Sequence, residues 1–289
     1  MTGTDTVHRL AIVGGGVMGT NIATTALGHG VDVVLVDVDD AALARARQKI
    51  TEKTRHAQLM RVLPDGREPG RLTTTTSLDE VADASAVIEA VVEVAEEKEK
   101  VLRQVGALVR PGTVLISNTS CIPVDEMAEW VARPEELVGV HFMNPTYLIK
   151  SVEVIRGPRT SAATMDGVHA LLAALGREGL VVNDNPGFVI NFLLHPLINS
   201  AAKLVERNVA SAEVVDKLLE GCLGHSTGPL RTADLIGIDN LVDSLVVLYE
   251  RTGDESCKPC DLMLAKVRTG DHGRKTGRGF FDYGKKVVS

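Results

Sequence analysis

A glycine-rich turn near the start of the chain constrains its fold more than any other feature. The segment Gly14-Gly15-Gly16-Val17-Met18-Gly19 follows a short apolar run at residues 9–13 and opens a helix-like stretch at residues 18–27. A second, valine-rich run at residues 31–36 completes a strand–helix–strand pattern. In this context the first glycine of the G-x-G-x-x-G spacing allows a tight turn, the second lets the backbone approach a pyrophosphate, and the third lets helix and strand pack closely. The pattern predicts a dinucleotide-binding unit.

An acidic residue after the second run indicates which dinucleotide is bound. Asp37 lies at the end of this predicted strand, where a carboxylate accepts hydrogen bonds from both ribose hydroxyls of NAD and repels the 2′-phosphate of NADP. No arginine follows Asp37 closely. The first helical N–H groups and the positive end of the helix dipole face the phosphates. The sequence therefore predicts NAD as the cofactor, and the predicted contacts are Gly14, Gly16, Val17, Met18, Gly19 and Asp37.

Two kinds of pattern divide the chain near residue 185. Before this point apolar runs alternate with helical stretches, and further strands are predicted at residues 86–92, 113–117, 137–142, 152–155 and 180–182. Such alternation predicts an α/β fold with a doubly wound parallel sheet of the Rossmann type. After residue 185 the predicted elements are helices, at residues 189–208, 211–221, 229–250 and 261–268. We therefore expect an NAD-binding domain over residues 1–185 and a smaller all-α substrate and dimerisation domain over residues 186–289.

Composition and charge narrow the classes of partner. The chain has 289 residues, enough for two domains, and its net charge of −7 without a basic patch argues against nucleic acid. No apolar run is long enough to span a bilayer and no signal-peptide pattern opens the chain, so a cytoplasmic protein is expected. The four cysteines include a single C-x-x-C pair, Cys257 and Cys260, which without nearby histidines predicts no metal site. A small, apolar all-α domain predicts a homodimer.

Further motifs follow the glycine turn in a fixed order. They include residues 88–93 (Ile-Glu-Ala-Val-Val-Glu), 117–120 (Ser-Asn-Thr-Ser), 139–145 (Gly-Val-His-Phe-Met-Asn-Pro), 152–155, 185–191, 228–230, 234–239 and 273–280. With these motifs the chain resembles the 3-hydroxyacyl-CoA dehydrogenase family, including bacterial 3-hydroxybutyryl-CoA dehydrogenases, over nearly its full length. The resemblance implies reversible oxidation of the 3-hydroxyl of a short acyl thioester, with the L (S) alcohol as substrate, and a place in fatty acid metabolism.

The resemblance also implies a role for particular residues. His141 matches the catalytic base of the family, and Glu153 matches the acid that orients this base. Ser120 and Asn191 match polar groups that contact the hydroxyl or carbonyl oxygen of the substrate. The residues that match the nicotinamide side of the cofactor site are Glu93, Lys98 and Asn118.

The chemistry of alcohol oxidation is consistent with this set. NAD takes a hydride, and a base must take the hydroxyl proton, for which histidine is suited because it exchanges protons near neutral pH. A glutamate on the other ring nitrogen fixes the tautomer and stabilises the imidazolium. His141 ends one predicted strand and Glu153 lies in the next, so adjacent strands could bring them together, while Ser120 follows a third strand. Asn191 belongs to the second predicted domain, so the substrate is expected between the domains.

The sequence departs from the family pattern where the substrate carrier is held. The helical excursion after the second strand, which helps to hold CoA, is shortened to a Pro/Gly loop at residues 63–70. At residues 145–150 the usual Pro-Val-Pro-x-Met-Lys is replaced by Pro-Thr-Tyr-Leu-Ile-Lys, which brings Tyr147 near the base, and Cys121 replaces a serine. The cations near the shortened segment, which could meet phosphates or form a solvated helix face, are Arg55, His56, Arg61 and Arg67.

Four functions therefore stay open at this point. The first is a short-chain 3-hydroxyacyl-CoA dehydrogenase, and the second is a relative that oxidises a 3-hydroxyacyl group on an acyl carrier protein, as in extender-unit supply for polyketide biosynthesis. The third is a dehydrogenase of a small free hydroxy acid. The fourth is a non-catalytic NAD-binding protein, in which Ser120 and Asn191 would be simple helix caps. The fourth gives no reason for His141 and Glu153 to occur together with these two residues.

Overall fold

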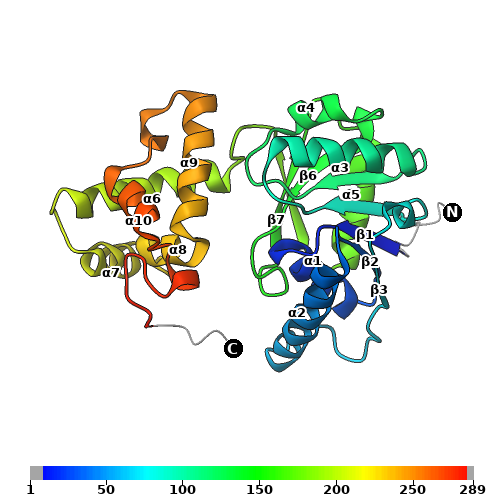
Figure 1. Cartoon of the computed structure of the whole chain (residues 1–289), viewed down its shortest axis with the longest axis horizontal. Helices are drawn as coiled ribbons and strands as arrows, with labels where there is room; N and C mark the ends of the chain where they lie inside the picture. The colour runs from blue at the N-terminus through cyan, green and yellow to red at the C-terminus, as the bar shows by residue number, and fades with distance from the viewer. Residues whose placement is uncertain (1–8, 285–289) are drawn as a thin grey trace. The chain divides into compact units, whose positions relative to one another are not determined.

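The computed structural model describes residues 9–284, and the chain divides between Asn185 and Pro186 into two compact units. We call the described residues before this point the sheet unit and those after it the helical unit. The sheet unit contains an eight-stranded sheet in the order β3-β2-β1-β4-β5-β6-β7-β8 (Figure 1). Its strands are β1 (Arg9–Val13), β2 (Asp32–Val36), β3 (Leu72–Thr75), β4 (Ala86–Glu89), β5 (Val114–Ser117), β6 (Leu137–His141), β7 (Ser151–Arg156) and β8 (Glu178–Asn183).

The direction of the strands differs from the prediction at one place. Neighbouring strands are parallel throughout the sheet except for β6 and β7, which are antiparallel. This reversal places the start of β7 beside the end of β6, at the edge of the sheet where the other parallel strands end. The predicted Rossmann-type α/β fold is confirmed, and β3, a short strand of mostly threonines, is an addition that the apolar pattern did not reveal.

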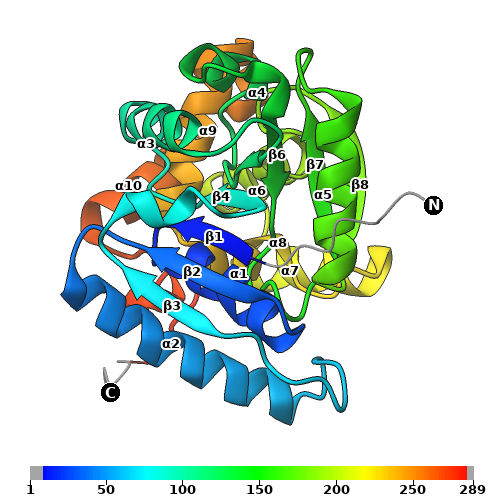
Figure 2. The same ribbon diagram turned by 90° about the vertical axis from the view of Figure 1, so that its right-hand side faces the viewer.

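Helices cover both faces of this sheet. They are α1 (Val17–Gly28), α2 (Asp40–Leu59), α3 (Ala95–Leu108), α4 (Val124–Met127) and α5 (Ala162–Ala174). One continuous apolar cluster joins Ile12 of β1 to Ile22 of α1 and Leu171 of α5, so these helices share one face of the sheet. Figure 2 shows α2 and α3 on opposite sides of the sheet. Because both faces are covered, the central strands β1 and β5 are apolar except for Arg9 at the start of β1 and Ser117 at the end of β5.

The helical unit is built from α6 (Ile190–Glu206), α7 (Ala212–Leu223), α8 (Pro229–Ile236), α9 (Ile238–Thr252) and α10 (Asp261–Thr269). The prediction of one helix over residues 229–250 is wrong, because Gly237 separates α8 from α9 with a φ of +101°. The left-handed side of backbone space is open to glycine and strained for other residues. The buried carboxylate of Asp234, just before the break, accepts hydrogen bonds from the N–H groups of Phe280 and Phe281 and ties the end of α8 to the C-terminal segment.

Neither a membrane span nor a metal cluster occurs in the part of the chain that the structure describes. Among residues 9–284 no helix is long and apolar enough to cross a bilayer. The same residues contain no group of three or more potential metal ligands. Cys257 and Cys260 are buried thiols, and burial raises the pKa of both, which favours the protonated form over the thiolate that binds metals.

Candidate functional site

The glycine turn leaves the end of β1 in a conformation that requires glycine at two positions. Gly14 has a φ of +107°, and a Cβ atom there would lie 2.6 Å from the carbonyl oxygen of Ala90. A Cβ atom on Gly19 would lie 1.8 Å from the carbonyl oxygen of Gly14. In front of Gly16, by contrast, no described residue other than its two chain neighbours has an atom within 4 Å of the position a Cβ would take. The turn is therefore closed toward the protein and open at its tip, where a phosphate group can approach the backbone.

The first turn of α1 supplies the polar groups that such a phosphate needs. No side chain caps this helix, and both Gly16 and Val17 are exposed. The N–H groups of a first helical turn have no partner within the helix, and the helix dipole adds partial positive charge at this end. The residues present therefore fit the pyrophosphate of a dinucleotide.

Asp37 lies where the ribose of such a dinucleotide is expected. Its Oδ2 accepts a hydrogen bond from the N–H of Gly15 at 2.6 Å, and its Oδ1 accepts one from the N–H of Val38 at 2.7 Å. These bonds hold the carboxylate at the end of β2, directly beside the glycine turn. A carboxylate has acceptor capacity for further donors, such as ribose hydroxyls.

Changing Asp37 to serine together with Val38→Arg should move cofactor preference from NAD toward NADP. The change removes the acceptor for the ribose hydroxyls and adds a cation for the 2′-phosphate, and we expect the ratio of kcat/KM for NAD over NADP to fall by at least about tenfold. Steady-state kinetics with both cofactors measures this ratio. The matched control is Asp39→Ser with Val38→Arg, which makes the same charge change at the acid that caps α2. An equal shift in the control would remove Asp37 from the site.

A buried ion network lies one strand further along the same edge of the sheet. Lys98 of α3, with none of its side chain exposed, places Nζ 2.8 Å from Oε1 of Glu89 and 3.1 Å from Oε2 of Glu93. Glu89, which ends β4, also accepts hydrogen bonds from the Ser117 hydroxyl at 2.6 Å and the N–H of Val91 at 2.8 Å. Burial alone would lower the pKa of Lys98, but the two carboxylates outweigh burial and raise this pKa. Lys98 is therefore a fully paired buried cation.

Glu93 connects this network to the loop that carries Ser120. Its Oε1 accepts hydrogen bonds from the Thr119 hydroxyl, from the N–H of Ser120 at 2.7 Å and from the N–H of Cys121 at 3.2 Å. Burial would raise the pKa of Glu93, but the charge of Lys98 and these hydrogen bonds lower it, so the group is a carboxylate at neutral pH. Glu93 thus fixes the backbone from which the Ser120 side chain projects.

Asn118 links the end of β5 to the end of β6. Its Oδ1 accepts a hydrogen bond from the N–H of Phe142 at 3.1 Å, and its own N–H donates to the carbonyl oxygen of Glu89 at 2.9 Å. The ends of β4, β5 and β6 are therefore held in register at the residues that the sequence singles out.

His141 and Glu153 form a buried pair at this edge. They are directly opposite each other in the antiparallel register of β6 and β7, and His141 Nδ1 lies 2.8 Å from Glu153 Oε2. Their side chains are 8% and 7% exposed. With Nδ1 bound to the carboxylate, Nε2 is the ring nitrogen at which a ligand would exchange a proton. The expectation that adjacent strands bring these two residues together is confirmed.

The loop after His141 is anchored to two helices. The Thr146 hydroxyl donates to the carbonyl oxygen of Asn21 at 2.7 Å and is hydrogen-bonded to the Thr25 hydroxyl of α1 at 2.6 Å. The Tyr147 hydroxyl lies 3.1 Å from Nδ1 of His56 on α2, and the tyrosine is buried. The tyrosine that departs from the family pattern therefore packs against α2.

The predicted residues fall into two groups. The first group lies at or beside the ends of neighbouring strands in the sheet unit. It consists of the glycine turn, Asp37, the Glu93–Lys98 pair, Asn118, Ser120 and the His141–Glu153 pair. Asn191 lies in the first turn of α6 in the helical unit, with 8% of its surface exposed. Sequence reasoning missed Glu89, although an acidic residue at the end of an otherwise apolar strand was the signal that could have revealed it.

Both units of the chain match known proteins. Residues 9–185 match the family model for the 3-hydroxyacyl-CoA dehydrogenase NAD binding domain, and residues 187–283 match the model for the C-terminal domain of that family. A probable 3-hydroxybutyryl-CoA dehydrogenase of Bacillus subtilis is 36% identical over 290 residues, covering 97% of this chain and 99% of the relative.

Solved structures agree with the sequence matches. The crystal structure of Mycobacterium tuberculosis FadB2 has a TM-score of 0.92 and 33% identity, covering 97% of this chain and 100% of that one. The (S)-3-hydroxybutyryl-CoA dehydrogenase PaaH1 of Ralstonia eutropha has a TM-score of 0.88 and 34% identity, covering 96% and 100%. The glycine turn and Asp37 lie within the matched NAD binding domain, so NAD is the cofactor. The chain belongs to the 3-hydroxyacyl-CoA dehydrogenase family.

Proposed function

We propose that this protein catalyses the NAD-dependent, reversible oxidation of the 3-hydroxyl of a short 3-hydroxyacyl thioester. The observation that carries the proposal is the buried His141–Glu153 pair, 2.8 Å apart, on the strand edge that also holds the cofactor turn. Relatives named as 3-hydroxybutyryl-CoA dehydrogenases support the thioester as substrate. The name of the Ralstonia protein supports the (S) alcohol.

In the proposed mechanism, the protein supplies the base and the contacts to the reacting oxygen. Glu153 holds the ring of His141 through Nδ1, so Nε2 takes the proton of the substrate hydroxyl, and the carboxylate stabilises the imidazolium that results. When bound, NAD would supply the hydride acceptor for the carbon that bears this hydroxyl. Ser120 binds the oxygen as it changes from hydroxyl to carbonyl. The substrate contact proposed for Asn191 rests on its match to the family motif. The Glu93 carboxylate keeps the Ser120 backbone in place throughout.

Two carriers of the acyl group, CoA and an acyl carrier protein, are compatible with this proposal. Arg55 on α2 and Arg61 after it are exposed cations that suit the phosphates of CoA. The segment between α2 and β3 contains no helix that could cover the nucleotide end of CoA. This observation favours, as a second candidate, an acyl group on the phosphopantetheine arm of an acyl carrier protein, which lacks that nucleotide.

Presenting one (S)-3-hydroxybutyryl group in three forms tests the proposal. The forms are the free acid, the CoA ester and the thioester of an acyl carrier protein, and NADH formation is followed for each. We expect the highest kcat/KM with a thioester and little turnover of the free acid. The better of the two thioesters identifies the carrier. Preference for the free acid would overturn the thioester assignment, and tight NAD binding without NADH from any form would support a non-catalytic protein.

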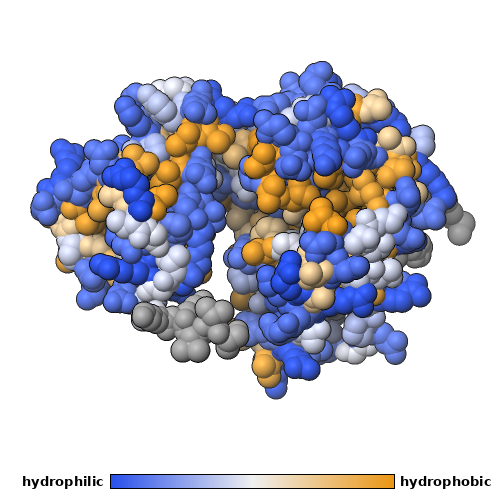
Figure 3. All heavy atoms as spheres, viewed as in Figure 1, coloured by the Kyte–Doolittle hydropathy of each residue, from blue (hydrophilic) through white to orange (hydrophobic). Residues whose placement is uncertain are grey.

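We also propose that the helical unit forms a homodimer. Leu193 on α6 and Leu218 and Leu223 on α7 are 65%, 52% and 68% exposed, and Figure 3 shows apolar residues at the surface of this unit. A contiguous exposed apolar patch is typical of association surfaces. Light scattering should give twice the 30.8 kDa chain mass, and Leu218→Lys should shift the protein toward the monomer. A clean monomer of the unchanged protein at micromolar concentration contradicts the dimer.

A further inference from the structure

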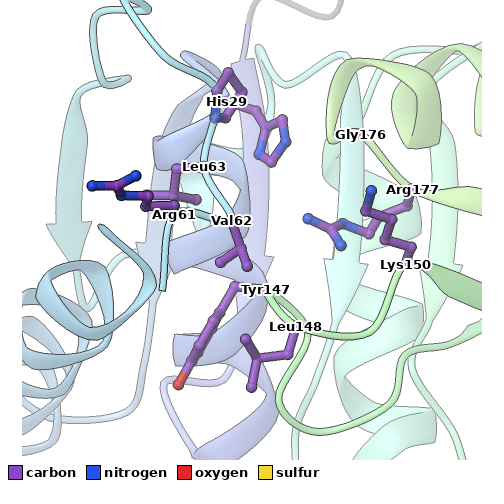
Figure 4. A pocket seen from close by; sticks show the side chains of 10 residues that line it. His29, Arg61, Val62, Leu63, Tyr147, Leu148, Lys150, Gly176 and Arg177 are labelled. Carbon is purple, nitrogen blue, oxygen red and sulfur yellow. The ribbon is translucent and has the colours of Figure 1, made fainter. Parts of the chain in front are cut away.

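A basic pocket of the sheet unit contains none of the residues assigned to proton or hydride transfer. Its volume is about 380 Å³, and it is lined by the end of α1, the segment after α2, the loop between β6 and β7 and the turn before β8 (Figure 4). Four of its lining residues, His29, Arg61, Lys150 and Arg177, carry basic side chains, and none of them is acidic. The lining therefore carries basic groups that no acidic residue of the pocket balances.

Arg177 is a buried cation without an acidic partner. Only 7% of it is exposed, and its Nε and Nη1 donate to the carbonyl oxygens of Leu175 and Ile149, both at 3.2 Å. Within residues 9–284 no carboxylate forms an ion pair with its guanidinium. Burial lowers the pKa of Arg177, which shows that its charge is poorly solvated. A buried charge is costly unless an opposite charge meets it, so this site is incomplete without an anion.

Two further basic groups face the same space. His29 is 6% exposed, and its Nδ1 lies 2.9 Å from the carbonyl oxygen of Thr25, which fixes the ring against Gly176. Burial, together with the charges of Arg177 and Arg67, lowers the pKa of His29. Figure 4 shows Arg177 pointing into the pocket toward His29, with Lys150 beside it, whereas Arg61 points away. Three basic side chains therefore line the same side of this pocket.

We propose that this pocket binds a phosphate monoester. Arg177 and Lys150 would bind the phosphate oxygens, and the phosphate would favour protonation of His29. The volume exceeds what a single phosphate needs, and Val62, Leu63 and Leu148 offer an apolar wall for the organic group. The phosphate monoester has two possible sources, the nucleotide end of a CoA substrate or a free metabolite. The binding itself does not rest on the proposed reaction.

Calorimetric titration with inorganic phosphate tests the site on the full chain. We expect saturable binding that Lys150→Met and Arg177→Met each weaken by at least about tenfold, because each removes a charge-assisted hydrogen bond. Lys150 is exposed, so its substitution leaves the folded core intact even if Arg177→Met does not fold. The matched control is Lys100→Met, an exposed lysine on α3 outside the pocket. Absence of binding at millimolar phosphate, or equal binding by Lys150→Met and the unchanged protein, overturns the proposal.

Two further experiments identify the source of the phosphate monoester and test the pocket independently of the proposed reaction. Competition by CoA but not by dephospho-CoA, which lacks the 3′-phosphate, would assign the pocket to the substrate carrier. Phosphate binding that neither compound displaces would assign it to a free phosphate monoester. His141→Ala should bind phosphate like the unchanged protein, so a failed reaction and a failed site give different results.

Discussion

Replacing His141 by alanine should lower kcat by about 10²–10⁴-fold, the usual contribution of a positioned acid–base group. The side chain that takes the hydroxyl proton is lost, while the glycine turn and Asp37 are unchanged. NADH should therefore bind with its normal affinity, which the fluorescence of the reduced cofactor measures directly. Loss of turnover with intact cofactor binding is the combination that a merely structural histidine would not give.

Two variants control this experiment. His169→Ala removes an exposed histidine of α5 and should have normal turnover. Glu153→Gln keeps a hydrogen-bonding group opposite His141 but removes the charge that stabilises the imidazolium, so it should lower kcat as well. Near-normal turnover of His141→Ala would contradict its assignment as the base.

Replacing Lys98 by methionine should destabilise the sheet unit by about 3–5 kcal/mol, the cost of leaving the other half of a buried ion pair without its partner. Glu89 is 1% exposed and would lose the cation that pairs with its carboxylate. The shift of the urea unfolding midpoint measures the loss. Because the pKa of Glu93 is lowered in the folded protein, the stabilisation is present above the unfolded value of 4.5 and is lost as the pH falls through the folded pKa. The difference in the free energy of unfolding between Lys98→Met and the unchanged protein should therefore become smaller at acidic pH.

The matched control lies on the same helix. Arg103 forms an exposed ion pair with Glu99 at one helical turn, and Arg103→Met should cost only about 0.2–1 kcal/mol. If the Lys98 and Arg103 variants unfold at the same urea concentration, the buried network does not stabilise the fold. If Lys98→Met is destabilised and also loses turnover more than Arg103→Met, the link through Glu93 to the Ser120 loop is supported.

The parts of the site that the sequence predicts well are those that depend on local backbone geometry and strand order. The glycine turn could be predicted because only glycine fits where Gly14 meets Ala90 and where Gly19 meets Gly14. The contact between His141 and Glu153 followed from their places in consecutive predicted strands, and the antiparallel register confirms it. Local patterns of apolar residues and glycines carry this information because strand and helix periods are short.

Other features depend on tertiary contacts that a local pattern does not contain. The burial of Lys98 and Glu89 contradicts the usual exposure of charged residues, and it is possible only because the two meet across α3 and β4. The break between α8 and α9 at Gly237 was missed because the apolar period continues through it. The contact of the Tyr147 hydroxyl with His56 of α2 was also missed, because it joins segments far apart in the chain.

The central claim is that this protein transfers a hydride from the carbon that bears the 3-hydroxyl to NAD. The most direct measurement uses (S)-3-hydroxybutyryl-CoA and its carrier-protein thioester with deuterium on that carbon, followed by mass analysis of the NADH formed. We expect one deuterium in the NADH for each substrate molecule oxidised, and none when the deuterium is supplied by the solvent. NADH without the label, or no NADH from either thioester, would contradict it.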